Sequence, residues 1–141
     1  MGFQIGSIVK AIYSKLSADV TLNNLITNIY VSSMPKKATF PCVVIGDNDL
    51  SETPFNAFGK RGKETLVNIY IYDSSNSDLT NISIAQRIDS LLEAKSDLTI
   101  DGCNHIQTIL VSSLFGYDVN SIEGTEVRAI RIQYKITTDE T

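Results

Sequence analysis

The chain has 141 residues, of which 43% are hydrophobic and 20% are charged, and its formal net charge is −4. This length predicts one domain over residues 1–141, large enough to bury a core of its own. The negative charge argues against a general nucleic-acid binder, because such a protein needs a basic face to displace counterions.

Two further features of the sequence indicate the cellular compartment in which the protein is made. Lys10 and Lys15 interrupt the apolar stretch near the N-terminus, which predicts neither a secretory signal nor a membrane span. The only cysteines are Cys42 and Cys103, so a disulfide scaffold is not expected and a reducing compartment is favoured. We therefore expect a protein that is made in a cytoplasm.

The chain opens with a predicted helix. Apolar residues at three- and four-residue steps indicate a helix over residues 5–16. A weaker helical pattern follows over residues 20–26, and Asp19 is available to begin it. Residues 28–31 are predicted to form a short extended piece.

A pair of strands follows. Residues 42–50 and 65–73 are the strand candidates, and a long loop over residues 53–63 is predicted to join them. In the second strand, apolar residues at 67, 69 and 71 share one face, and one asparagine and two tyrosines share the other. Both faces of this strand are therefore expected to be at least partly covered.

The second half of the chain repeats this order. Apolar residues at 84, 88, 91 and 92 indicate a helix, which Ser77 or Asp78 can cap. Residues 126–138 alternate between apolar and polar, which is typical of an antiparallel strand with one wet face. Residues 105–115 are apolar on both faces, which suits either a central position in the sheet or a contact between subunits.

The histidine and the cysteines raise the question of a zinc site. His105 lies two residues after Cys103, and Cys42 is a third candidate ligand. Structural zinc sites need four ligands, commonly with closely spaced cysteine pairs, so we instead expect two buried thiols and a histidine at a strand end. No metal and no cofactor is predicted.

The acidic run after the first strand resembles the start of a calcium loop. Asp47 and Asp49 stand at alternate positions, but Glu52 replaces the glycine required at the sixth position and Phe58 replaces the glutamate usual at the twelfth. We expect a solvated strand end, with loose cation binding by Asp47, Asp49 and Glu52 as the alternative.

A basic, glycine-rich run lies in the loop between the first two strands. Lys60 and Arg61 are the only residues between two glycines, whereas a phosphate-binding loop has four there and leads into a helix. Phe55 and Phe58 lie beside these cations and Lys63, and aromatic and arginine side chains are favoured interface anchors. The segment is therefore either a cationic contact loop or a mobile surface loop.

Catalytic signatures are weak. No serine stands in the sequence context of a nucleophile elbow, and neither cysteine has a recognisable histidine and orienting partner. No catalytic residue is predicted, and an enzyme is not expected.

The order of elements carries a resemblance. The segments involved are the opening helix, residues 29–31, 40–44, 67–72, 83–92 and 128–134, and the long polar loop. From residue 5 to residue 136 this order resembles that of the tail-completion proteins of long-tailed bacteriophages and prophages, a minor tail family related to tail terminators. Cys42 departs from the pattern, because an aromatic residue, commonly tyrosine, is expected after the proline.

The resemblance implies an α+β fold, with a mainly antiparallel sheet of about four strands, in two hairpins, packed against two main helices. It also implies a homo-oligomeric ring, a hexamer, that caps the head-proximal end of the tail tube, ends tube polymerisation and allows head–tail joining. The implied partners are other copies of the chain, the tail tube protein and a head-side connector protein. DNA would pass through the ring without specific binding, and the protein would reside in the tail or neck of the virion after synthesis in the bacterial cytoplasm.

A ring needs two dissimilar surfaces on each subunit. Arg131 and Lys135, on the polar face of the last strand, are candidates to meet Asp47 and Asp49 of a neighbour. Such pairs would set orientation more than affinity.

Two other functions remain open. A head-side connector or stopper protein of the neck would share this size and composition. A non-viral α+β binding module, or a small enzyme, would instead show a titratable ligand or turnover. Concentration-dependent ring formation would favour the two virion roles.

Overall fold

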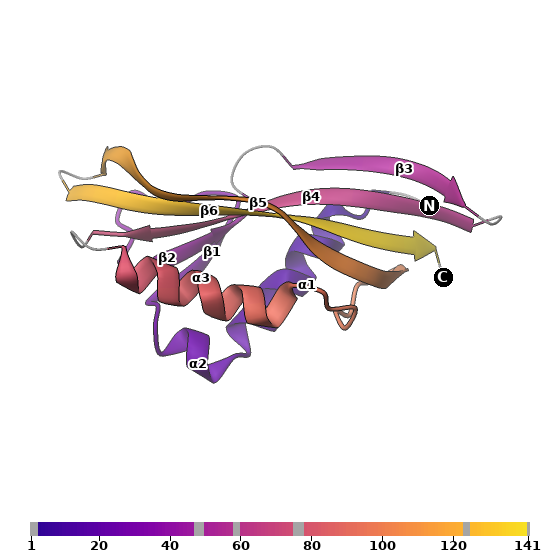
Figure 1. The fold of residues 1–141 in the computed structure, drawn as a ribbon, viewed down its shortest axis with the longest axis horizontal. Helices are drawn as coiled ribbons and strands as arrows, with labels where there is room; N and C mark the ends of the chain where they lie inside the picture. The colour runs from indigo at the N-terminus through magenta and orange to yellow at the C-terminus, as the bar shows by residue number, and fades with distance from the viewer. Residues whose placement is uncertain (1–2, 47–49, 58–59, 75–77, 123–124, 141) are drawn as a thin grey trace.

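The computed structural model describes residues 3–46, 50–57, 60–74, 78–122 and 125–140. Within these residues, three helices and six strands are present, and all the strands belong to one sheet (Figure 1). The α+β class implied by the resemblance agrees with this architecture.

The sheet is organised around one long strand. The strand order is β1-β2-β4-β6-β5, and β3 pairs with β4 beside this path. β1 runs parallel to β2, and the other pairings are antiparallel. β4 therefore has β6 along one side and both β2 and β3 along the other. The strands are β1 (Asn28–Val31), β2 (Cys42–Ile45), β3 (Ser51–Ala57), β4 (Lys60–Asp73), β5 (Cys103–Ile122) and β6 (Thr125–Glu140).

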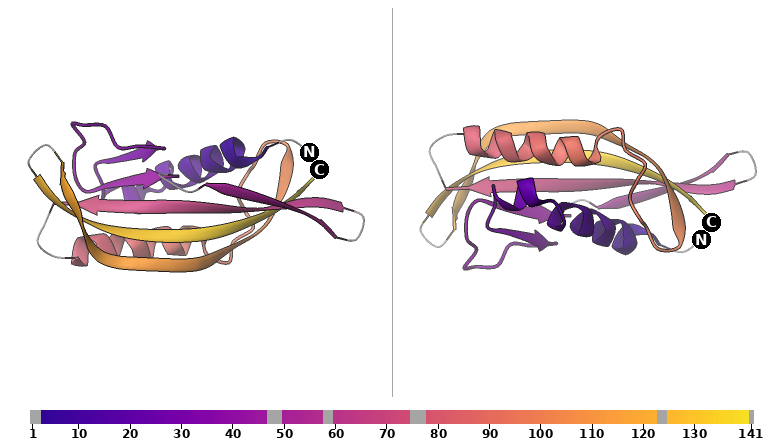
Figure 2. Two further views of the ribbon diagram at one scale, coloured as in Figure 1. Left: turned by 90° about the horizontal axis from the view of Figure 1, so that it is seen from above. Right: turned by 90° about the horizontal axis from the view of Figure 1, so that it is seen from below.

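The helices lie on one face of the sheet (Figures 1 and 2). They are α1 (Ile5–Ser17), α2 (Val20–Asn23) and α3 (Leu79–Leu92). α1 packs towards β1 and β2, whereas α3 packs beneath β4 and β6. In the part of the chain that the structure describes, no helix has the length and apolarity needed to cross a membrane.

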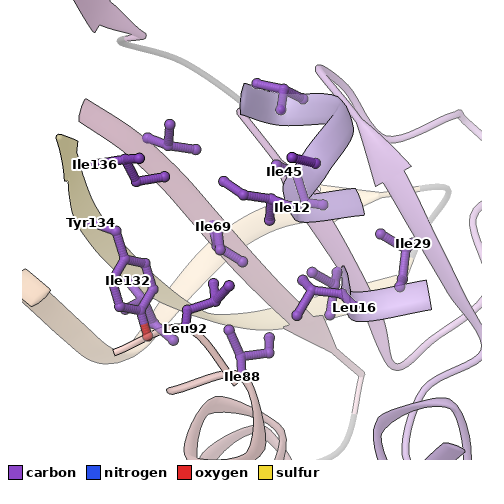
Figure 3. Packing of buried hydrophobic residues seen from close by; sticks show 14 of the residues in the cluster. Ile12, Leu16, Ile29, Ile45, Ile69, Ile88, Leu92, Ile132, Tyr134 and Ile136 are labelled. Atoms are coloured by element: carbon purple, nitrogen blue, oxygen red, sulfur yellow. The ribbon is translucent and has the colours of Figure 1, made fainter. Parts of the chain in front are cut away.

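The main core fills the space between these helices and the sheet (Figure 3). Ile12 and Leu16 of α1 and Ile88 of α3 are fully buried, as is Ile69 of β4. Each such side chain contributes about 1.5–3 kcal/mol by leaving water. The predicted apolar stripes of both helices are thus the faces that the sheet covers.

A second, smaller cluster lies on the opposite face of the sheet. It consists of Cys42, Val44, Tyr70, Tyr72, Val127 and Ala129. The rings of Tyr70 and Tyr72 stack with centroids 6.0 Å apart and an interplanar angle of 8°. The expectation that both faces of residues 65–73 are covered is confirmed, because Asn68, Tyr70 and Tyr72 are all buried.

The predicted number of strands is wrong, since the sheet has six rather than about four. Residues 28–31 are a true edge strand, parallel to β2. Residues 51–57, predicted to lie mostly in a loop, pair with residues 60–66 of β4. The strand predicted over residues 42–50 ends at Ile45. β4 extends well beyond its pairing with β2, and β3 satisfies the backbone groups that this extension leaves along that side.

Polar side chains lie at the N-termini of α2 and α3, and one of them links the two helices. Asp19 begins α2 as predicted, because its Oδ2 accepts a hydrogen bond of 2.8 Å from the Leu22 backbone N–H. Arg87 of α3 donates to the same carboxylate through Nε at 2.8 Å and Nη2 at 2.6 Å. These hydrogen bonds from Arg87 lower the pKa of Asp19 to about 2. α3 begins at Leu79, and Asp78 stands at its N-cap position without a side-chain capping hydrogen bond.

Candidate functional site

The first candidate surface is the end of the sheet that β3 forms with the first half of β4, which we call the arm. It consists of residues 51–57 of β3 and residues 60–66 of β4, paired from Ser51–Leu66 to Ala57–Lys60. Residues 62–66 of the arm also pair with residues 135–139 of β6, and only the outer end of the arm reaches past the helices and beyond the ends of β5 and β6 (Figures 1 and 2). The segment predicted as a contact loop is therefore built on paired strands.

The aromatic residue of the arm packs inside it. Phe55 lies opposite Gly62, and its ring occupies the place where a Cβ on Gly62 would project. Glycine in a strand loses side-chain contacts, and a facing aromatic ring restores them. Phe55 is half-buried in this position, so it supports the arm in addition to any external contact.

The base of the arm contains an ion pair. Lys63 Nζ lies 3.1 Å from Glu52 Oε2, and the two side chains are only 10% and 6% exposed. The Gln4 backbone N–H donates to Glu52 Oε1 at 2.5 Å, and Lys63 Nζ lies 5.3 Å from the centroid of the Phe3 ring. Lys63, predicted as a contact cation, is thus engaged with the N-terminal segment and is not a surface cation.

The far end of the arm carries two further cations that were predicted to make contacts. Arg61 is exposed and lines a shallow hollow with Pro54, Phe55, Asn56, Gly62 and Lys63. Lys60 precedes Arg61 in the chain, and its backbone pairs with Ala57 at the far end of the arm. Phe58 lies outside the described residues.

Two further predicted cations lie on the sheet face away from the helices. Lys135 stands opposite Leu66 at the base of the arm, and its Nζ is 3.9 Å from Glu64 Oε1. Arg131 stands four residues along β6, opposite Tyr70, and is half-buried. Their suggested acidic partners, Asp47 and Asp49, lie outside the described residues.

The strand that is apolar on both faces is β5, and it lies at the end of the strand order. The prediction of a central position is therefore wrong, which leaves the alternative of a contact between subunits. Among the side chains of β5 that the structure describes, the exposed large apolar residues are Ile106, Ile109, Leu110, Val111, Leu114 and Phe115. The sequence pattern does not single them out as site residues, because periodicity shows which residues share a face but not whether a strand is central.

The candidate zinc ligands do not come together. Cys42 belongs to the cluster on the outer face of the sheet, with Sγ 3.6 Å from Met34 Sδ, whereas Cys103 belongs to the core beneath the helices. Burial raises the pKa of Cys42 to about 12, so this thiol is a poor nucleophile and a poor ligand. Among the described residues, no group of three or more histidine, cysteine or acidic side chains could hold a metal ion.

The histidine has a local structural partner on each ring nitrogen. His105 Nδ1 accepts a hydrogen bond of 3.1 Å from the Leu98 N–H, and Nε2 lies 2.8 Å from Thr108 Oγ1. Because Nδ1 accepts, Nε2 carries the proton and donates to the threonine. Burial lowers the pKa of His105, which favours this neutral form.

Comparisons with known proteins give a family and a fold. The family model described as "Tail completion protein gp17" matches residues 10–135. No curated protein matches the chain significantly.

Two solved structures share the fold. A chain in the structure described as "Virion of native gene transfer agent (GTA) particle" matches with a TM-score of 0.82 and 16% identity, over 99% of each chain. The gp17 protein of bacteriophage SPP1 matches with a TM-score of 0.50 and 20% identity, over 94% of this chain and 95% of that one.

Proposed function

The chain belongs to the tail completion protein gp17 family, and from this premise we propose that it completes the tail of a phage-like particle. As a ring of identical subunits, a hexamer, it would cap the head-proximal end of the tail tube and end tube polymerisation. It would then present a surface to which a head-side connector protein binds. We propose no catalytic step for it.

The observation that carries this proposal is the family match over residues 10–135, which spans nearly the whole chain. The virion particle that contains a chain of the same fold, matched over 99% of each chain, supports a structural role in a particle. The family match also favours this role over a free-standing binding module.

The arm supports a docking role at one end of the ring. Its outer end reaches past the helix-covered body and carries the exposed Arg61, with Lys60 next to it in the chain. An arm of paired strands is already ordered, so docking would cost less conformational entropy than ordering a loop. We propose that the arm contacts the tail tube protein or the head-side connector protein.

The charge of the subunit supports the passage of DNA through the ring. The formal net charge of −4 on each chain gives a ring that phosphates do not adhere to non-specifically.

Deletion of the gene in the phage or prophage that carries it tests the role. The expected result is filled heads beside free tails, with tails of uncontrolled length, seen by electron microscopy of negatively stained lysates. Supplying the wild-type chain from a plasmid should restore joined particles. Normal, joined and infectious particles in the deletion strain would reject the role.

A charge-reversal variant tests the arm. Lys60→Glu with Arg61→Glu should prevent joining in the complementation assay, while the purified chain keeps the wild-type urea midpoint. The matched control is Lys36→Glu with Lys37→Glu, which reverses two consecutive exposed lysines between β1 and β2. Full complementation by the arm variant would refute the contact assignment.

A further inference from the structure

Two apolar grooves lie at opposite edges of the sheet, each beside a helix. The first, the β5 groove, runs between α3 and β5 and is lined by Ile82, Ala85, Asp89, Leu110, Phe115 and Ile132. The second, the α1 groove, runs between α1 and β1 and is lined by Ile5, Val9, Lys10, Tyr13, Val31 and Leu50. Because β5 and β1 are the two ends of the strand order, the grooves lie at opposite edges of the sheet, and Figure 2 shows these two strands on opposite sides of β4.

We propose that the β5 groove of one copy of this chain packs against the α1 groove of a second copy, head to tail. The inference rests on the proposed ring and specifies which surfaces of the subunit build it.

The exposed apolar side chains give the first argument. On the β5 side, Phe115 is 53% exposed and Leu110 is 37% exposed. On the α1 side, Tyr13 is 40% exposed and Val31 is 44% exposed. A long edge strand with exposed apolar side chains invites association, and a monomer would be expected to blunt such an edge with charges.

The type of contact follows from what already covers the edge of β5. The Ala94 N–H donates to the Thr108 carbonyl at 2.9 Å, and the Thr108 N–H donates to the Lys95 carbonyl at 3.0 Å. The Leu110 N–H donates to Glu93 Oε2 at 2.5 Å. These hydrogen bonds occupy the outer backbone groups at residues 108–110, so a neighbour cannot simply add a strand there. At residues 108–110, beside the groove, the contact would therefore be made by side chains.

The charges at the two grooves are complementary. Asp89 lines the β5 groove and Glu93 lies one helical turn further, whereas Lys10 is exposed in the α1 groove. A symmetric contact between two β5 grooves would bring carboxylates against carboxylates, which opposes association. A contact between a β5 groove and an α1 groove instead brings a lysine to these carboxylates.

Head-to-tail contacts are also the kind that can close into a ring. A subunit with two dissimilar contact surfaces forms a chain of subunits that closes when the rotation between neighbours divides a full turn. Each copy would then use one β5 groove and one α1 groove, and neither of these two grooves would stay exposed in a closed ring.

Cysteine cross-linking of the purified full chain tests this pairing. Phe115→Cys and Tyr13→Cys each place one reactive thiol in one groove, while Cys42 and Cys103 are 0% and 5% exposed. A bismaleimide should cross-link the two variants only when they are mixed. The chain that carries both substitutions should give a ladder that stops at one ring size, and the wild type should give no product.

Disruption of the β5 groove gives an independent readout. Phe115→Asp should weaken self-association at least about tenfold in sedimentation velocity, with the urea midpoint of the diluted monomer unchanged. The control, Val20→Asp, changes a side chain that is 74% exposed on α2, outside both grooves, and should associate like the wild type.

Several results would overturn the pairing. They are cross-linking of Phe115→Cys to itself, a wild type that stays monomeric at the highest soluble concentration, and rings that persist with Phe115→Asp. These outcomes are separable from failure of the proposed function. Normal tails in the deletion strain, together with head-to-tail cross-links in the purified chain, would reject tail completion and keep the pairing.

Discussion

Replacing Lys63 with methionine tests the ion pair at the base of the arm. Lys63 Nζ and Glu52 Oε2 are 3.1 Å apart, and both side chains are at most one-tenth exposed. Removal of the ammonium group leaves a buried carboxylate whose other oxygen still accepts a hydrogen bond from the Gln4 N–H. Methionine fills a similar volume, so the change removes charge with little loss of packing.

The expected cost follows from this burial. Removing one partner of a buried pair costs about 3–5 kcal/mol, and the remaining Gln4 hydrogen bond places Lys63→Met near the lower end, at about 3 kcal/mol. The matched control is Lys15→Met, because Lys15 and Asp97 are 2.8 Å apart but 30% and 54% exposed. An exposed pair contributes about 0–1 kcal/mol, so this control should change little.

Urea denaturation followed by circular dichroism measures the difference. A loss of 3 kcal/mol should lower the midpoint by roughly 1–3 M at the slopes usual for small proteins. The double variant Lys63→Met with Glu52→Gln should regain part of the loss, because the amide oxygen still accepts from the Gln4 N–H without a charge. Equal midpoints for Lys63→Met and Lys15→Met would refute the argument that burial decides the value of this pair.

Three further predictions concern single side chains. Asp19→Asn should destabilise the fold by about 1–2 kcal/mol near neutral pH, because the amide keeps the cap but loses the charge-assisted pairing with its arginine. The pKa of Asp19 is about 2 instead of 3.8. The extra stability of the wild type over Asp19→Asn should therefore be complete above about pH 4 and be lost as the pH falls through 2. Urea denaturation of both proteins at several pH values between about 2 and 7 would test this. Tyr134→Phe should cost about 1–2 kcal/mol, because the buried phenol donates to Asp89 Oδ1 at 2.9 Å. Burial and this hydrogen bond raise the pKa of Tyr134, so the difference between wild type and Tyr134→Phe should shrink as the pH rises above about 10, by up to about 1.4 kcal/mol per unit in urea titrations. Gly62→Ala should displace the Phe55 ring and destabilise the arm, seen as faster amide exchange at residues 60–66, whereas Gly6→Ala, where a Cβ meets nothing within 4 Å, should not slow or speed exchange there.

The helices and the last strand could be predicted because burial imposes a period on them. The stripe of α1 faces the sheet at Ile8, Ile12 and Leu16, at the helical spacing that the sequence shows. β6 alternates because Ile130 and Ile132 face the helices and Arg131 faces away.

β3 could not be predicted in the same way, because little of it is buried. Thr53 and Pro54 are both exposed, and Pro54 is tolerated because β3 lies beside β4 at an edge. With no apolar alternation, residues 51–57 carry no signal for a strand. Their conformation is set by pairing with the extension of β4.

The candidate site shows the same division between local and long-range information. The sequence identifies Lys63 as a cation, but its burial depends on the strand register that puts it near Glu52, eleven residues earlier in the chain. The pattern of residues 105–115 did predict either burial or a subunit contact, and only the strand order decides that β5 is an edge. For Arg61 and Lys60 the contact role stays a prediction.

The length of β4 has a mechanical consequence. Its 14 residues extend over roughly 45 Å, from the outer end of the arm to the helix-covered core. Antiparallel hydrogen bonds run perpendicular to the strands, so a pull along β4 loads its ladders to β6 and β2 in shear, many bonds at once. A pull across the sheet would instead peel β3 away one residue pair at a time. A load on the arm along the strand axis is therefore transmitted through β4 to the core as tension, whereas a load across the sheet acts first on the few residue pairs at the end of β3.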